Sequence, residues 1–235
     1  MSSTGSFEHL PLANGDVAEV HIRVDGRARR ISIKVDRIGG LVTLTAPSRS
    51  ALPAARRFLS RRVDWIAERR AGAETAVPLV PGRDVPVLGR PRRIDHDPQA
   101  RDLARLLPDS LVVGGRASAV DRTVRTFLKA EARRRLEAAA QNYAARIGRR
   151  VAAVSVRDQK TRWGSCAASG RLSFSWRLVM APERVLTYVA AHEVAHLRHM
   201  NHSPDFWSLV AKLDPDWRAA EKWLKHEGPA LRRYG

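Results

Sequence analysis

Ala191-His-Glu-Val-Ala-His-Leu-Arg-His-Met-Asn-His202 is the stretch around which the rest of the chain is organised. It contains the pattern His-Glu-x-x-His, and four of the chain's eight histidines fall within it. Helix positions four apart lie on one face, so His192 and His196 can direct both imidazoles to one point, as two zinc ligands require. Glu193 lies beside them, close enough to reach a water on the metal. Because hydrogen-bonded core residues do not readily explain this combination on an otherwise apolar helix, we predict a metal site.

A catalytic zinc site needs a third protein ligand, for which His199 and His202 compete. On a continuing helix His199 would lie seven residues beyond His192, or about 10.5 Å along the axis, which is a poor geometry for one shared ion. Ser203-Pro204 predicts the start of a new helix, so the chain can turn back before it and bring His202 to the metal. We therefore predict His202 as the third ligand. The outside candidates are Asp205 and Glu227.

The spacing of the three histidines matches the metzincin pattern His-Glu-x-x-His-x-x-Gly-x-x-His. That pattern has glycine where this chain has His199, and it is followed by a methionine, whereas no methionine follows Met200. The ligand spacing holds, but the metzincin assignment fails.

The clearest alternation of apolar and polar residues lies at residues 171–180, before the predicted helix that carries His192 and His196, which we call the metal helix. It predicts a strand with one buried face, and two interpretations of it stay open. As an edge strand it would align an extended peptide by strand addition, and otherwise it is an ordinary sheet strand. Residues 157–170 before it have a turn-like composition.

Three side chains near this strand are candidates for substrate binding, namely Arg162, Trp163 and Arg177. Arg162 and Trp163 can bind an anion or stack on a base, and the alternative is a packed Trp beside a solvent-directed Arg. An oxyanion stabiliser is also needed, and the sequence does not choose among the candidates. They are Tyr188, Arg177, Arg162 and His199.

The fold class predicted for the whole chain is α+β, with a β-rich N-terminal half packed on a helical, metal-binding C-terminal half. Residues 1–16 are predicted to be a disordered tail. Residues 17–118 are predicted to be β-rich, beginning with a meander of three short strands. Residues 119–235 are predicted to form the metal-binding domain, starting with a long helix over residues 119–147.

The formal charge of +18 in 235 residues is unusual and is mostly arginine. It favours either a solvated basic surface or attraction to phosphates, so nucleic acid stays a possible partner. Cys166 is the only cysteine, which excludes an intrachain disulfide and suits a reducing compartment. No signal peptide or membrane-length apolar run is evident, so we predict a cytoplasmic protein with no membrane partner.

Four ordered segments resemble the YgjP-like metallopeptidase family and, more loosely, SprT-type and WLM-type proteases. They are Gln159-Lys-Thr-Arg-Trp-Gly-Ser-Cys166, Leu172-Ser-Phe-Ser-Trp-Arg-Leu178, His192-Glu-Val-Ala-His196 and Met200-Asn-His-Ser-Pro-Asp-Phe-Trp207. The resemblance covers about residues 19–227. It implies a zincin-like fold of the minimal gluzincin type, with Zn²⁺ on His192, His196 and His202 and with Glu193 as general base.

The residues and the resemblance together support three functional hypotheses. The first is a zinc peptidase of the cytoplasm acting on peptides or proteins. The second is a metal-dependent nucleotide phosphohydrolase of the nucleoside triphosphate pyrophosphatase type, in which Lys160, Arg162 and Arg177 would offset phosphate charge. The third is a nucleic-acid-associated protease, as the SprT-type resemblance suggests.

Overall fold

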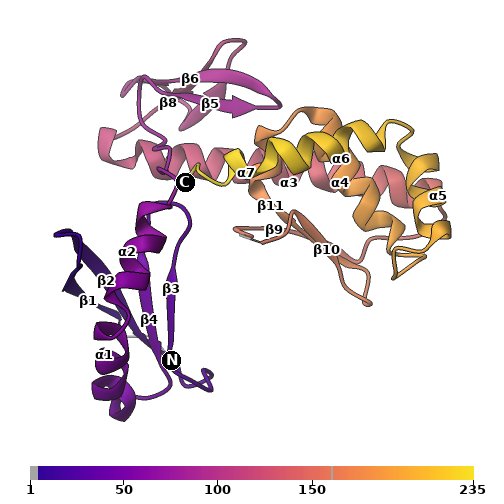
Figure 1. Ribbon diagram of the computed structural model, residues 1–235. Helices are drawn as coiled ribbons and strands as arrows, with labels where there is room; N and C mark the ends of the chain where they lie inside the picture. The colour runs from indigo at the N-terminus through magenta and orange to yellow at the C-terminus, as the bar shows by residue number, and fades with distance from the viewer. Residues whose placement is uncertain (1–4, 160) are drawn as a thin grey trace. The chain divides into compact units, whose positions relative to one another are not determined.

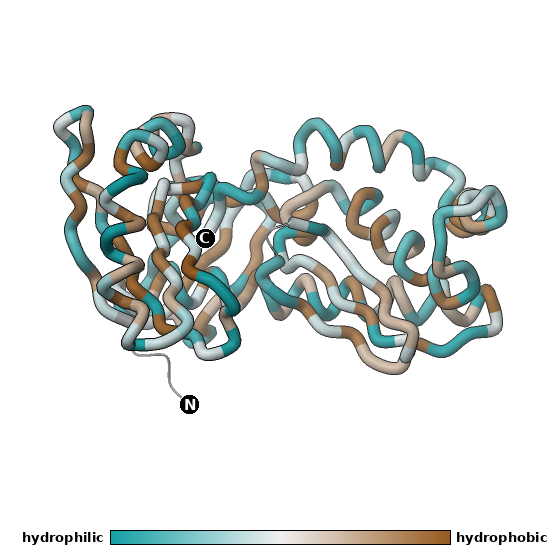
Figure 2. Tube along the Cα trace, turned by 60° about the horizontal axis from the view of Figure 1, so that its bottom comes forward, coloured by the Kyte–Doolittle hydropathy of each residue, from teal (hydrophilic) through white to brown (hydrophobic). Residues whose placement is uncertain are grey.

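The computed structural model describes residues 5–159 and 161–235, and their contacts divide the chain into two compact units, residues 1–76 and 77–235. Both units combine sheets and helices (Figure 1). The α+β class expected from the sequence is therefore confirmed. In each unit, apolar positions alternate with polar ones along the strands and helices (Figure 2).

Unit 1 is a four-stranded sheet, in the order β1-β2-β4-β3, with two helices packed on one face. The alternate residues Val42, Leu44 and Ala46 of β4 are fully buried and meet Leu59 and Ile66 of the helices. The elements are β1 Gly5–Pro11, β2 Val17–Val24, β3 Ser32–Val35, β4 Val42–Ala46, the 3₁₀ turn η1 Arg49–Ala51, α1 Leu52–Ser60 and α2 Val63–Ala71.

Strand β1 lies where a disordered tail was expected. It pairs antiparallel with β2 from Gly5 opposite Arg23 to Pro11 opposite Val17. The intervening turn contains Gly15 in the left-handed region, at φ +84°. The polar composition of this segment predicted disorder, but the segment also contains Asn14-Gly15, and an Asn-Gly pair is a strong signal for a β-hairpin. Residues 1–4 lie outside the described residues.

The predicted meander is wrong, because β2 and β4 are parallel neighbours. Strand β3 pairs antiparallel with β4 and lies at the edge of the sheet. The physical reason is apolar content: β4 buries three residues, whereas Ser32 and Lys34 of β3 are exposed. The more apolar strand takes the central position.

The second sheet belongs to unit 2, although the sequence predicted a domain boundary after residue 118. Its order is β5-β6-β8-β7. Its buried residues, such as Ile94 and Leu111, share one core with Val124 and Leu128 of the long helix α3. The sheet therefore packs with the C-terminal part of the chain. The elements are β5 Asp84–Val87, β6 Arg90–His96, β7 Ala104–Leu106, β8 Ser110–Val113, the 3₁₀ turn η2 Ala117–Ala119 and α3 Val120–Arg146.

The third sheet holds the segment that precedes the metal helix. Strands β9 Ala153–Arg157, β10 Gly164–Cys166 and β11 Arg171–Ser175 are arranged in the order β10-β11-β9. The strand predicted for residues 171–180 ends at Ser175, and a 3₁₀ helix η3, Trp176–Met180, comes after it. All five residues of η3 are buried, so that segment has no solvent-facing side to alternate with. The edge-strand interpretation is wrong, because β11 is central and β10 lies at the edge.

Four helices complete unit 2: α4 Glu183–Ala195, α5 Pro204–Leu213, α6 Trp217–His226 and α7 Gly228–Leu231. Nine residues of α4 are buried, which makes it a core helix. The predicted cap of α5 is present, since the Ser203 hydroxyl accepts a hydrogen bond from the Phe206 amide. Among the described residues, none of the helices combines the length and apolar character that a membrane span requires.

Candidate metal centre

Three histidines converge at the end of α4. His192, His196 and His202 each offer a ring nitrogen, and these atoms all lie within 4.8 Å of one another. The Nε2 atoms of His192 and His202 are 3.2 Å apart. Helix α4 supplies His192, the C-cap residue of the same helix is His196, and the turn before α5 supplies His202. Three imidazole nitrogens around one point form a donor set that suits zinc and other divalent transition metals.

The chain turns back to deliver His202 because α4 ends earlier than the sequence predicted. The helix stops at Ala195 rather than near Met200, and tight turns come next, with the amide of Arg198 donating to the carbonyl of Ala195 at 3.0 Å. Nδ1 of His196 lies 2.9 Å from the carbonyl oxygen of His199. An Nδ1–H donated to that carbonyl leaves Nε2 of His196 free to bind a metal.

The aromatic side chains of Phe206 and Trp207 pack against the three imidazoles. The Phe206 ring centroid lies 5.0, 4.5 and 4.8 Å from those of His192, His196 and His202. Trp207 stacks on His202 and on Trp217, at centroid distances of 5.8 and 4.7 Å. Because Phe206 and Trp207 lie in the first turn of α5, the Ser203 cap that starts this helix also positions these rings against the three histidines.

Burial keeps His192 and His196 in the protonation state that a metal needs. Burial first, and then the charges of His196 and His202, together lower the pKa of His192 to about 4. Burial also lowers the pKa of His196. Both imidazoles are therefore neutral near pH 7, with lone pairs available for coordination.

Glu193 lies beside the histidines with its side chain directed against strand β10. The residue is 6% exposed. Burial raises the pKa of its carboxyl to about 7, although the nearby Arg162 charge acts to lower it. A carboxyl with a pKa near neutrality can both take and release a proton at physiological pH.

Gly164 is what allows Glu193 to lie there. A Cβ at position 164 would be 2.5 Å from Oε1 of Glu193, and 2.7 and 2.8 Å from its Cγ and Cδ. Every residue except glycine would therefore push the carboxylate away from its position. Gly164 is a candidate site residue that sequence reasoning missed, because no local pattern shows which side chain faces it across 29 positions of sequence.

Replacing Gly164 by alanine is expected to lower turnover by roughly 10- to 100-fold while leaving bound metal unchanged, because Glu193 must move and the three histidines need not. Steady-state kinetics together with metal analysis check this. In a Glu193→Gln background the same substitution should cost little further activity, since the displaced group no longer transfers protons. A Gly164→Ala enzyme with wild-type turnover would contradict this role.

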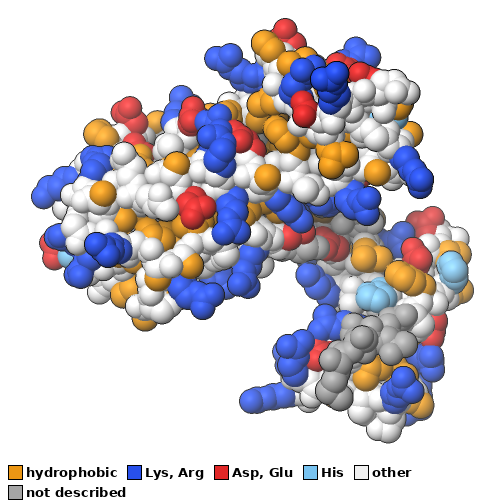
Figure 3. All heavy atoms as spheres, turned by 180° about the vertical axis from the view of Figure 1, so that it is seen from behind, with side chains coloured by type: hydrophobic (Ala, Val, Ile, Leu, Met, Phe, Trp, Pro, Cys, Tyr) orange, Lys and Arg blue, Asp and Glu red, His pale blue; other side chains and the backbone are white. Residues whose placement is uncertain are grey.

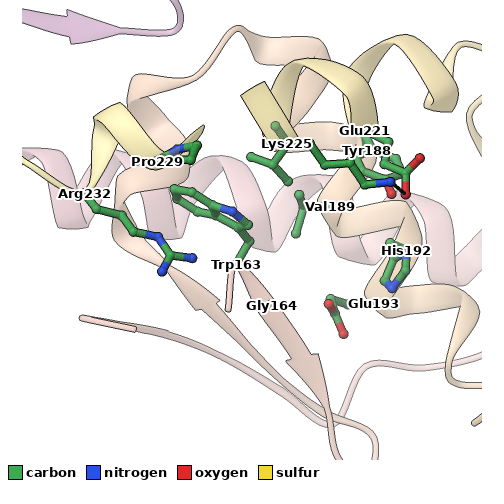
Figure 4. A pocket seen from close by; sticks show the side chains of 11 residues that line it. Trp163, Gly164, Tyr188, Val189, His192, Glu193, Glu221, Lys225, Pro229 and Arg232 are labelled. Atoms are coloured by element: carbon green, nitrogen blue, oxygen red, sulfur yellow. Dashed lines mark ion pairs between the residues drawn. The ribbon is translucent and has the colours of Figure 1, made fainter. Parts of the chain in front are cut away.

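A pocket of about 400 Å³ opens beside His192 and Glu193 (Figure 4). The ion pair between Glu221 and Lys225, at 3.0 Å, lies on one side of it. The Arg232 guanidinium lies over the Trp163 ring, 5.1 Å from its centroid. The apolar walls are Trp163, Val189, Leu224 and Pro229.

The predicted substrate residues fall in three different places. Trp163 lines the pocket beside the metal centre, whereas Arg162 lines a second cavity on the same sheet. Arg177 is 4% exposed, and its guanidinium donates to Asp158 and to the carbonyl oxygens of Tyr234 and Gly235. This placement argues against a substrate contact for Arg177, whose side chain instead holds the C-terminal segment.

The other candidates can also be located. Tyr188 lines the pocket together with His192 and Glu193. Asp205 and Glu227 are exposed and lie outside the three-histidine group. Lys160 lies outside the described residues.

Three comparisons with known proteins bear on this site. No curated protein matches this chain. Among solved structures, the metallopeptidase zymogen of Pyrococcus abyssi abylysin matches with a TM-score of 0.36 and 22% identity, over 39% of this chain and 95% of that one. The family model of the YgjP-like metallopeptidase domain matches residues 29–227, and the chain therefore belongs to the YgjP-like metallopeptidase family.

Proposed function

We propose that this protein is a zinc-dependent peptidase whose ligands are His192, His196 and His202 and whose general base is Glu193. The observation that carries the proposal is the convergence of three ring nitrogens within 4.8 Å beside a buried carboxyl. Membership of a metallopeptidase family supports it.

Zinc is the metal that the donor set favours. A ligand set of three imidazoles, with no thiolate or carboxylate ligand, is typical of catalytic zinc sites, which keep a fourth position open. When bound there, zinc supplies Lewis acidity that lowers the pKa of an attacking water and polarises the scissile carbonyl. The chain's own residues do the rest of the chemistry.

Glu193 would accept the proton of the attacking water on its carboxylate and pass it to the leaving amine. Its raised pKa supports this exchange, because a carboxyl near pH 7 is a stronger base than an ordinary glutamate and still releases the proton. Tyr188 is the oxyanion candidate that we favour, since it alone of the four candidates lines the pocket with His192 and Glu193. The pKa of its hydroxyl is raised by burial, which keeps the hydroxyl protonated as a donor.

Strand β10, rather than β11, would align the substrate. It is one of the two edge strands of its sheet, and its Gly164 lies against Glu193. An extended peptide added at this edge would run past the general base, with one side chain in the pocket walled by Trp163 and Leu224. We therefore expect a preference for an apolar side chain next to the cleaved bond.

The nucleotide hypothesis has less support at the metal centre. Arg177, which was expected to offset phosphate charge, is engaged with Asp158 and the C-terminal segment. The Lys225 charge in the pocket beside His192 is paired with Glu221. Arginine and lysine side chains are spread over the face seen in Figure 3 rather than gathered in one patch, which gives the nucleic-acid hypothesis no defined surface there.

A panel of unstructured peptides, folded proteins and nucleoside triphosphates tests the proposal. We expect cleavage of unstructured peptides, loss of cleavage after treatment with a zinc chelator, and recovery when zinc is added back. Mass spectrometry of the products would give the cleaved bonds and check the apolar preference. Hydrolysis of triphosphates without cleavage of any peptide would overturn the peptidase assignment in favour of a phosphohydrolase.

A further inference from the structure

A second cavity, of about 720 Å³, lies on the β9-β11-β10 sheet. Its floor is a row of serines in register, because Ser173 of β11 is opposite Ser155 of β9 and Ser165 of β10. Side chains alternate between the faces of a sheet. The serines therefore face away from Phe174, which is buried in the core, and away from Gly164, which touches Glu193. The serine floor of this cavity thus lies on the face of the sheet that is turned away from Glu193.

The charge of the cavity lining is wholly positive. Arg157, Arg162 and Arg171 line it, and no aspartate or glutamate does. Within the described part of the chain, none of these three arginines forms an ion pair with a carboxylate. Three guanidinium groups around one hollow repel one another unless an anion lies among them.

The floor adds a hydrogen-bond donor to this charge at Ser173, whereas the Ser155 hydroxyl already donates to the carbonyl oxygen of Leu172 at 3.2 Å. The Ser173 hydroxyl oxygen accepts a hydrogen bond from Nε2 of Gln159 at 3.0 Å. Its own proton is therefore available to a ligand, since a hydroxyl can donate one hydrogen bond while it accepts another. Guanidinium and hydroxyl donors together are typical of sites that bind phosphate oxygens.

We propose that this cavity, which we call the serine-arginine pocket, binds a small anion carrying two or more phosphate groups. A charge of about +3 matches a pyrophosphate or triphosphate group better than a single carboxylate, which would leave guanidinium groups unpaired. An extended peptide fits poorly, because the backbone of β11 on the floor is already paired with strands on both sides and has no free edge to offer. The pocket volume lies in the range of small-ligand sites.

Calorimetric titration of the full chain with inorganic tripolyphosphate, at constant ionic strength, tests the proposal. We expect one binding site per chain and at least tenfold weaker binding by the double variant Arg157→Gln/Arg171→Gln. The matched control is Arg90→Gln/Arg105→Gln, which removes two exposed arginines of unit 2 outside the pocket and should bind within twofold of wild type. Circular dichroism would show that both variants are folded.

The metal centre provides the second arm of the test. His202→Ala should bind tripolyphosphate as the wild type does, because none of the three histidines lines the serine-arginine pocket. Absence of binding, equal losses in the two double variants, or loss in His202→Ala would each overturn the proposal. Tighter binding of an acidic peptide or a single-stranded oligonucleotide, with the same dependence on Arg157 and Arg171, would overturn the small-anion assignment and show that the pocket binds that ligand instead. None of these results depends on whether the protein cleaves peptides.

Discussion

Replacing Glu193 by glutamine is expected to lower the turnover number by about 10²- to 10⁴-fold, the range that general acid-base groups contribute, while the zinc content stays that of the wild type. Glutamine has nearly the shape of glutamate, so it should fit against Gly164 without moving β10. It cannot take a proton from water at neutral pH. Folding should not suffer, because the variant replaces a carboxyl that is 6% exposed by a neutral group.

A second carboxylate of the same pocket provides the control for this experiment. Glu221 lines the pocket with Glu193, but its carboxylate is paired with Lys225 at 3.0 Å. Glu221→Gln should therefore keep turnover within a few-fold of wild type. The measurements are steady-state peptide hydrolysis, zinc by mass spectrometry and the melting temperature. A Glu193→Gln enzyme with full activity would remove Glu193 from the mechanism and with it our account of the reaction.

Loss of the His202 imidazole is expected to weaken zinc binding by at least about a hundredfold. Mutation of residues that only hydrogen-bond to a metal ligand already weakens metal binding by about 10- to 100-fold, and loss of a ligand itself should cost at least as much. His202 supplies one of three ring nitrogens, and its Nε2 lies 3.2 Å from that of His192. A site reduced to two histidines lacks the three protein ligands of catalytic zinc. His202→Ala should consequently lose zinc on dialysis and lose peptide hydrolysis with it.

His199→Ala is the matched control, because it removes a histidine three residues away in the same turn. The contact of His199 with His196 is made by its main-chain carbonyl, which alanine keeps. This variant should hold zinc as the wild type does and retain activity within a few-fold. Zinc titration of both proteins decides the matter: retention by His202→Ala with loss by His199→Ala would reverse the assignment of the third ligand.

Local patterns were sufficient for much of the candidate site. A four-residue spacing on a helix dictates that His192 and His196 share a face, whatever surrounds the helix. The Ser203 cap predicted where the next helix begins, and the structure has that cap and brings His202 to the other two histidines. In the same way, the apolar repeat of α3 predicted a long helix that the structure places at Val120–Arg146.

The sequence pattern gave the wrong secondary structure for a segment that is buried on all sides rather than on one face. The alternation over residues 171–180 predicts one strand, yet its second half is the 3₁₀ helix η3, in which all five residues are buried. Alternation distinguishes a strand only when one face meets solvent. The domain boundary predicted after residue 118 failed for a different reason, since the sheet formed by β5 to β8 joins unit 2 through a core that it shares with α3.

The sequence alone determined the candidate metal-binding histidines, the general-base candidate, the α+β class and the family resemblance, because these depend on residue type and on spacing along one helix or one cap. Only the tertiary structure decided that β10 is an edge strand and β11 the central one, that Gly164 makes room for Glu193, that Arg177 is turned away from the pocket, and that three arginines surround a row of serines. These are contacts between segments distant in the chain. Strand order and side-chain packing determine such contacts, and no periodicity within a single segment encodes them.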